Sequence, residues 1–164
     1  MRPRDDSSEV MHETVSHVLV ALSDWLGWNS QDGEQAKIEQ DLSMALSSKH
    51  NGYEIAKFLD TSCGWKDIDA DLVGLLQGAT ETHRCVHRRH VRSWVKKSAL
   101  VPKRKLGETV LDGANELLVV EINLEDGMYT LKRRDERERI RSFGDERPFE
   151  EIDALFPIQS EGAK

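Results

Sequence analysis

The spacing of apolar residues changes at Pro102, and this change limits the fold more than any other feature of the chain. Before Pro102, apolar residues recur three and four positions apart, which is the period of an amphipathic α-helix. After Pro102, short segments rich in Val, Ile, Thr, Tyr and Phe partly alternate apolar with polar residues, as β-strands do. The sequence therefore predicts an α+β protein, in which an N-terminal helical bundle precedes a small antiparallel β domain.

Five helices are predicted before Pro102. The apolar stripe of the first helix begins at Val10 and ends at Leu26. Asp67 is a suitable N-cap for the fourth helix, because its carboxylate can accept a hydrogen bond from a free N–H group of the first turn. Gly78 is expected to end that helix. The predicted ranges are 8–26, 33–49, 53–63, 67–78 and 81–98.

Four strands are predicted after Pro102, at 107–111, 116–124, 128–133 and 137–143. Glu125-Asp126-Gly127 is the strongest hairpin signal, because Asp-Gly readily adopts the positive φ angles of a tight turn. Alternation places one face of the second strand against Tyr129 and Leu131; the residues of that face are Leu118, Val120, Ile122 and Leu124. The charged run 133–139 is expected to be a solvated edge that blocks aggregation, or a partner-binding face.

These patterns divide the chain into five segments. We expect a disordered tail at 1–7, the helical bundle at 8–100, a basic hinge at 101–106, the small β domain at 107–158 and a second disordered tail at 159–164. Neither tail has apolar anchors.

The β domain has a recognisable order of elements. Gly107, the strand Val119-Val120-Glu121-Ile122, the turn Asp126-Gly127, the strand Tyr129-Thr130-Leu131 and the segment Pro148-Phe149-Glu150-Glu151-Ile152 follow one another. This order resembles small SH3-like barrels of the Tudor and KOW type, in which a bent hairpin precedes a short helical turn and a last strand. The resemblance covers only 107–157 and implies a binding module without a specified ligand. The alternative is an open three-stranded sheet packed on the bundle.

The aromatic residues available for the ligand cage of such a barrel are few. They are Tyr129, Phe143, Phe149 and Phe156, and most of them are expected in the core.

The segment 80–105 concentrates positive charge. It contains nine basic residues and one acidic residue, Glu81, and therefore carries +8. Because the net charge of the whole chain is -7, the remaining residues carry -15. The basic residues are Arg84, Arg88, Arg89, Arg92, Lys96, Lys97, Lys103, Arg104 and Lys105.

This basic segment has two interpretations. Arg88, Arg92 and Lys96 are four residues apart and form a ridge suited to phosphates or to an acidic protein surface. In the other interpretation, acidic neighbours within the chain neutralise the ridge; the candidates are Asp67, Asp69, Asp71 and the region around Glu136.

The same predicted helix carries His83, His87 and His90, which are spaced to share one face. Together with Cys63 they are the candidate ligands for a metal ion, although the neighbouring cations oppose one. Cys85 beside these cations is the only candidate nucleophile, but nothing in the sequence supplies an oxyanion site or a phosphate-binding loop. We therefore expect no catalytic residue, no cofactor and no enzymatic activity.

The remaining features narrow the class of protein. No segment reaches the roughly 20 apolar residues of a membrane helix, and the start MRPRDDSSEV lacks the apolar stretch of a secretory signal. Two cysteines exclude a disulfide framework. We expect a cytoplasmic interaction protein, such as an adaptor, regulator or inhibitor, with another protein as its partner and no membrane. The first alternative is nucleic-acid binding by the basic helix, and the second is a metal- or thiol-dependent activity at the Cys/His cluster.

Overall fold

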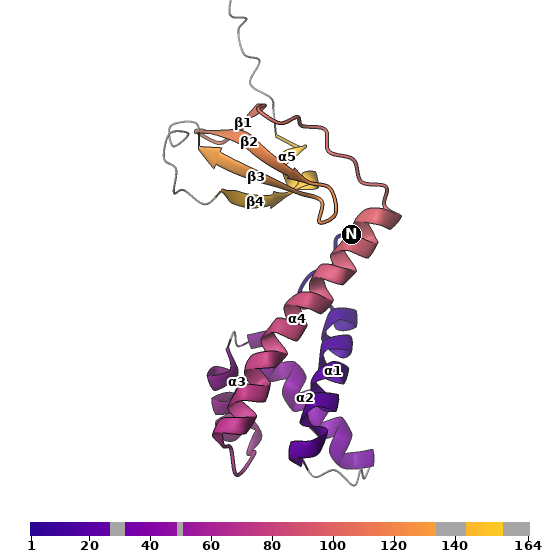
Figure 1. Cartoon of the computed structure of the whole chain (residues 1–164), viewed down its shortest axis with the longest axis vertical. Coiled ribbons are helices and arrows are strands. Elements are labelled where there is room, and N and C mark those ends of the chain that lie inside the picture. Colours follow the sequence, from indigo (N-terminus) through magenta and orange to yellow (C-terminus); the bar gives the residue numbers. More distant parts are fainter. Residues whose placement is uncertain (27–31, 49–50, 134–143, 156–164) are drawn as a thin grey trace, which may run out of the picture. The chain divides into compact units, whose positions relative to one another are not determined.

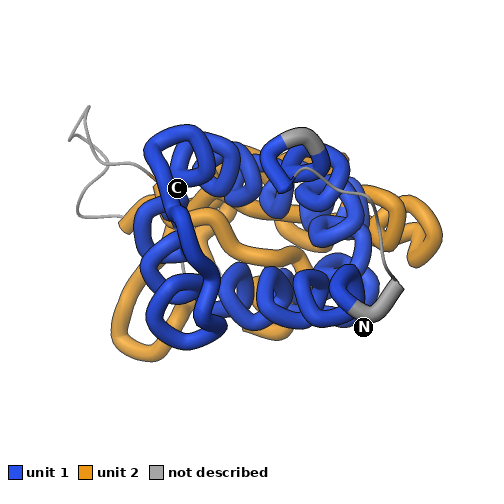
Figure 2. Tube along the Cα trace, turned by 90° about the horizontal axis from the view of Figure 1, so that it is seen from below, with its two compact units in different colours: residues 1–91 blue, residues 92–164 orange. Residues whose placement is uncertain are grey.

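The computed structural model describes residues 1–26, 32–48, 51–133 and 144–155. Helices precede a four-stranded antiparallel sheet (Figure 1), which confirms the predicted α+β class. The chain divides into two compact units, Met1–Val91 (unit 1) and Arg92–Lys164 (unit 2), which Figure 2 colours separately. This division lies within helix α4 (Ala70–Lys97), N-terminal to the 101–106 segment that the sequence suggested as a hinge.

Unit 1 is built from helices around an aliphatic core. Besides most of α4, unit 1 contains α1 (Ser8–Leu26), α2 (Asp32–Ser48), α3 (Gly52–Phe58) and a π-helical turn, η1 (Leu59–Cys63). Each helix contributes side chains that are almost fully buried, among them Leu22, Leu42, Ile55, Leu72 and Leu76. Burying one such side chain stabilises a fold by about 1.5–3 kcal/mol, so this shared core holds the helices together.

Helix α4 is longer than predicted. The expected break at Gly78 is wrong, because the predicted fourth and fifth helices form one continuous helix of 28 residues. A glycine inside a helix costs only about 1 kcal/mol relative to alanine. Buried Leu76 and Ala79 on either side of Gly78 pack in the core and offset that cost.

The N-termini of two helices are capped by side chains. The N-terminal cap of α4 is Asp69 rather than Asp67, since Asp69 Oδ1 accepts a hydrogen bond from Leu72 N at 2.8 Å. Asn51 caps α3, since its side-chain oxygen accepts a hydrogen bond from Glu54 N at 2.9 Å. At the end of η1, Gly64 adopts φ +77°.

Unit 2 contains the last turns of α4 and the sheet. The strands are β1 (Thr109–Asp112), β2 (Asn115–Asn123), β3 (Met128–Arg133) and β4 (Asp145–Pro148), paired in the order β1-β2-β3-β4, and a short helix follows, α5 (Phe149–Ile152). The predicted turn at 125–127 joins β2 to β3, and Gly127 adopts φ +62° there. The core of unit 2 is formed by Val110, Leu117, Val119, Tyr129, Leu131, Phe149 and Ile152.

The face of β2 that meets the core differs from the prediction. Leu117 and Val119 are buried, whereas Leu118 is half-buried and Leu124 is exposed. Nearly every residue from 117 to 122 is apolar, so alternation alone does not identify the inward face. A bulge between Val119 and Glu121 then shifts the register, and Ile122 also packs against the core.

Several predicted features lie outside the described residues. These are the strand 137–143, the final strand of the barrel resemblance beyond residue 155, the tail 159–164, and the aromatic residues Phe143 and Phe156. The segment 1–7 is described, and the Pro3 carbonyl oxygen lies 3.2 Å from His87 Nε2 of α4.

Gly52 supplies the first test of this packing. A Cβ atom at Gly52 would lie 2.5 Å from both Gln77 N and Val73 O in the backbone of α4. We therefore expect Gly52→Ala to lower the free energy of unfolding by about 1–3 kcal/mol, because backbone atoms cannot move aside cheaply. Urea denaturation followed by tryptophan fluorescence measures this change.

Gly78→Ala is the matched control. A Cβ atom there meets nothing within 4 Å, so this substitution is expected to raise stability by about 0.5–1 kcal/mol through helix propensity. Equal effects of the two substitutions would show that α3 and α4 do not approach as closely as described.

Candidate functional site

Two arginines of α4 in unit 1 are neutralised by glutamates. Arg84 Nη1 lies 2.8 Å from Glu81 Oε1, and Arg89 Nη2 pairs with Glu13 Oε1 of α1. Arg88 is exposed. The basic ridge predicted on this helix is therefore partly compensated within unit 1.

The acidic residues that neutralise the arginines are not the predicted ones. Asp69 caps α4 and also accepts a hydrogen bond from Trp25 Nε1, and its hydrogen bond with Leu72 lowers the pKa of its carboxyl group. Glu136 lies outside the described residues. Glu13 was missed because it is 76 positions from Arg89 in the chain, and no spacing rule links the two.

Arg92 fastens the end of α4 to the β2–β3 hairpin within unit 2. Arg92 Nε lies 2.7 Å from Asp126 Oδ1, and Arg92 Nη2 lies 3.1 Å from Glu125 Oε2. Asn123 Nδ2 donates to the other carboxylate oxygen of Asp126 at 3.1 Å. The hydrogen bond with Asp126 raises the pKa of Arg92. This guanidinium is thus committed to the fold of unit 2.

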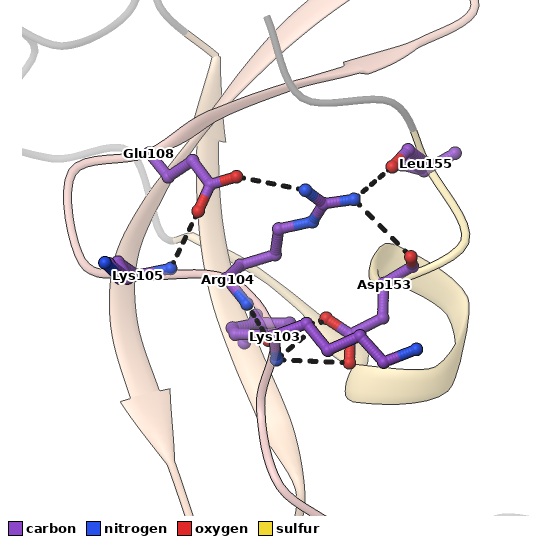
Figure 3. A network of polar contacts seen from close by, with 7 residues as sticks. Lys103, Arg104, Lys105, Glu108, Asp153 and Leu155 are labelled. Atoms are coloured by element: carbon purple, nitrogen blue, oxygen red, sulfur yellow. Dashed lines mark hydrogen bonds and ion pairs between the residues drawn. The ribbon is translucent and has the colours of Figure 1, made fainter. Parts of the chain in front are cut away.

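Arg104 is also committed to the fold (Figure 3). Its side chain is only 11% exposed, and Arg104 Nη1 lies 3.0 Å from Glu108 Oε1. Arg104 Nη2 donates to the backbone carbonyl oxygens of Asp153 and Leu155. The guanidinium therefore joins the connector that follows α4 to the segment that follows α5.

Tyr129 anchors the same connector from the core. Its hydroxyl accepts a hydrogen bond from Arg104 N at 2.9 Å and donates one to Asp153 Oδ1 at 2.8 Å. Burial, reinforced by the Asp153 carboxylate, raises the pKa of Tyr129 to about 12. The Tyr129 ring packs against Phe149 with a centroid distance of 4.5 Å. Both rings are fully buried, so neither supplies an exposed aromatic cage.

Four lysines of the basic segment remain uncompensated. Their side-chain ammonium groups form no ion pair with any described residue, and all four residues are exposed; they are Lys96, Lys97, Lys103 and Lys105. The backbone N–H groups of Lys103 and Lys105 bond to Asp153 and Glu108, which leaves the side chains outside the network. Within the basic segment, the described charge of unit 2 that is available to a partner is therefore carried by lysines rather than by Arg92 and Arg104.

A groove of about 480 Å³ in unit 2 is lined in part by one of these lysines, Lys96. Its lining is mostly apolar and consists of Arg92, Val95, Lys96, Ala99, Leu100, Val101, Leu124 and Glu125. Val101 is 71% exposed and Leu124 is 62% exposed. This combination of exposed apolar side chains in a depression makes the groove the candidate site.

The three histidines of α4 each bond to a different group. His83 Nδ1 lies 3.3 Å from Thr14 Oγ1, whose proton is donated to Val10 O, so the imidazole is the donor. His87 Nε2 donates to the carbonyl oxygen of Pro3, and His90 Nε2 donates to Glu13 Oε2 at 2.6 Å. Among the described residues, no three His, Cys, Asp or Glu side chains are grouped to hold a metal ion.

The two cysteines have different surroundings, and both are free thiols. Burial, with a smaller effect of Asp41, raises the pKa of the Cys63 thiol, which makes it a poor nucleophile. Cys85 is exposed and lines a shallow depression with His17 and Arg89. Two histidines near Cys85 in the sequence bond elsewhere, His87 to the carbonyl oxygen of Pro3 and His90 to Glu13.

Comparison of the chain with protein-family models, with curated proteins and with solved structures gave no match. Within the described part of the chain, no helix is both long enough and apolar enough to cross a bilayer.

Arg104 is expected to be a structural residue. Replacing it by methionine keeps much of the apolar stem but leaves Glu108 and two carbonyl oxygens without their charged donor, and we expect a loss of about 3 kcal/mol in the stability of unit 2. Hydrogen exchange of peptides from β2 and β3 measures this loss locally.

The control is Lys105→Met, since this neighbouring lysine is exposed and outside the network. Its exchange rates are expected to match wild type. Comparable protection in the Arg104 and Lys105 variants would contradict the structural assignment of Arg104.

The burial of His83 predicts how the stability of the fold depends on pH. Burial lowers the pKa of its imidazole, helped by His87 and opposed by Asp5. The folded state therefore resists a proton that the unfolded state accepts near its usual pKa of about 6.5, and stability falls as the pH drops below that value. We expect His83→Gln to reduce the decline between about pH 7 and pH 5.5, measured by urea denaturation. His12→Gln controls for the removal of an exposed imidazole, and an undiminished decline in His83→Gln would contradict the prediction.

Proposed function

We propose that the chain is a non-enzymatic interaction protein that binds another protein through unit 2, as an adaptor, regulator or inhibitor. The basic end of α4 and the β2–β3 hairpin form the binding surface. The two free thiols, one of them exposed, support action in the reducing cytoplasm.

The groove carries this proposal. A single exposed leucine is common on soluble proteins, but a depression lined by several apolar side chains and by an uncompensated lysine, Lys96, favours a protein-binding site. Val101 and Leu124 belong to neither aliphatic core, so their apolar character is not needed for folding. Burial of these two side chains by a partner would supply the apolar part of an interface, and the lysines would supply its polar rim.

The β part of unit 2 is proposed to be an SH3-like module. Its hairpin is bent by the bulge in β2, and the short helix α5 follows β4 as in that class of barrel. Arg147 of β4 lies 3.3 Å from Asp112 of β1, which brings the two edge strands of the sheet towards each other. These features support a curved, barrel-like sheet that displays its hairpin tip to a partner.

The proposal is tested with a variant of the groove. Val101→Glu combined with Leu124→Glu is expected to remove protein partners that the wild-type chain retains in a quantitative pull-down, with a loss of about tenfold or more. Val20→Glu on α1 is the matched control, because Val20 is 76% exposed and lies in unit 1. Partners retained equally by the groove variant would contradict the proposal.

Nucleic acid is the rival ligand for the free lysines. Labelled duplex DNA, single-stranded DNA and RNA are titrated in parallel at low and near-physiological salt. Binding that weakens steeply with salt and survives the groove variant would place nucleic-acid binding first, since phosphate contacts release counterions and need no apolar anchor. Absence of binding at low salt would remove that rival.

A further inference from the structure

We infer that the groove of unit 2 accepts an acidic amphipathic helix from a partner protein. This inference rests on the proposed function and specifies its ligand. It follows from the charge at the groove, from its apolar lining and from the elements that supply that lining.

The uncompensated charge at the groove is positive. Arg92 and Glu125 both line the groove, but they pair with each other at 3.1 Å, and Arg92 also pairs with buried Asp126. The remaining charged residue of the lining is Lys96, and the next residue, Lys97, is also basic. Neither ammonium group has an acidic partner among the described residues. A segment with acidic side chains would supply the missing charge, whereas a basic segment would be repelled.

The apolar lining requires side-chain anchors. Val95 of α4, Ala99 just beyond the end of that helix, and Leu124 of the hairpin all line the groove. Val101 and Leu124 are mostly exposed and gain the most from being covered. A partner must therefore present apolar side chains as well as acidic ones.

The lining of the groove does not fit the other common way of binding a peptide. Addition of a strand requires a free sheet edge, and the edges of the described sheet are β1 and β4. The described lining of the groove contains no strand residue, because Leu124 and Glu125 lie in the turn between β2 and β3 and the other lining residues belong to α4 or follow it. Recognition at the groove must therefore rely on side chains, as when a helix docks with apolar residues three and four positions apart.

Three synthetic peptides test this inference with the full-length chain. Each has about 18 residues, which span about five helical turns, and the same apolar residues at helical spacing. The polar positions are glutamate in the first peptide, glutamine in the second and lysine in the third. Fluorescence anisotropy is expected to show that the glutamate peptide binds about tenfold or more tightly than the other two, and that its affinity falls as salt rises.

Variants of the chain separate the charge from the apolar anchor. Lys96→Glu with Lys97→Glu is expected to lower the affinity for the glutamate peptide by about tenfold and to raise the affinity for the lysine peptide. Leu124→Glu is expected to lower the affinity for both the glutamate and the glutamine peptide by about tenfold. Lys57→Glu in unit 1 is the charge control, because Lys57 is exposed on α3. Circular dichroism confirms that each variant is folded.

The outcomes distinguish this inference from the proposed function. If the glutamine or lysine peptide binds as tightly as the glutamate peptide and depends on Leu124, the groove binds proteins but the acidic partner is wrong. If the glutamate peptide does not bind up to about 1 mM, the inference is overturned, and the pull-down decides the proposed function. If sedimentation shows a dimer that Leu124→Glu dissociates, the occupant is a second copy and the inference is also overturned.

Discussion

The connector between α4 and the sheet depends on the carboxylate of Asp153. It accepts hydrogen bonds from the Tyr129 hydroxyl and from Lys103 N, and the backbone carbonyl of the same residue accepts from Arg104. Because Tyr129 lies in the core and Arg104 lies in the connector, this network links buried and exposed parts of unit 2. Residues 103–105 of the segment expected to be a basic hinge are therefore bonded to the β part of unit 2. Val101 lies two residues before this stretch and is 71% exposed.

The helices were more predictable than their ends. The apolar stripe of α1, with Val15 and Leu22 at its centre, repeats with the helical period, and burial follows that period. The end predicted at Gly78 failed because a glycine signals a helix end only where packing does not continue beyond it. Core residues such as Ala79 and Thr80 lie immediately after Gly78, but their burial depends on tertiary contacts that a local pattern does not contain. The prediction of which face of β2 is buried failed for the same reason.

The candidate site was predictable in its charge but not in its position. Nine basic residues within 80–105 were visible in the sequence, yet their roles differ between neighbours. Arg104 is buried in a network, while Lys105 beside it is exposed. This difference follows from Glu108 and Asp153, of which Asp153 is 49 residues from Arg104. The arginines form most of the internal ion pairs of the basic segment, in keeping with the ability of a guanidinium to bond to several oxygens at once.

Val101 and Leu124 are exposed apolar side chains of the groove. A polar residue at either position would leave the aliphatic cores untouched, since neither side chain belongs to them. Leu124 precedes Glu125 and Asp126, which hold Arg92, so the ion pairs that fasten α4 to the hairpin also fix Leu124 at the side of the groove. The ion pairs that neutralise Arg92 therefore also position Leu124 in the lining of the groove. Lys96, one turn after Arg92, is the charged residue of the lining without an acidic partner among the described residues, and in the proposed function it would let the groove select by charge as well as by apolar contact.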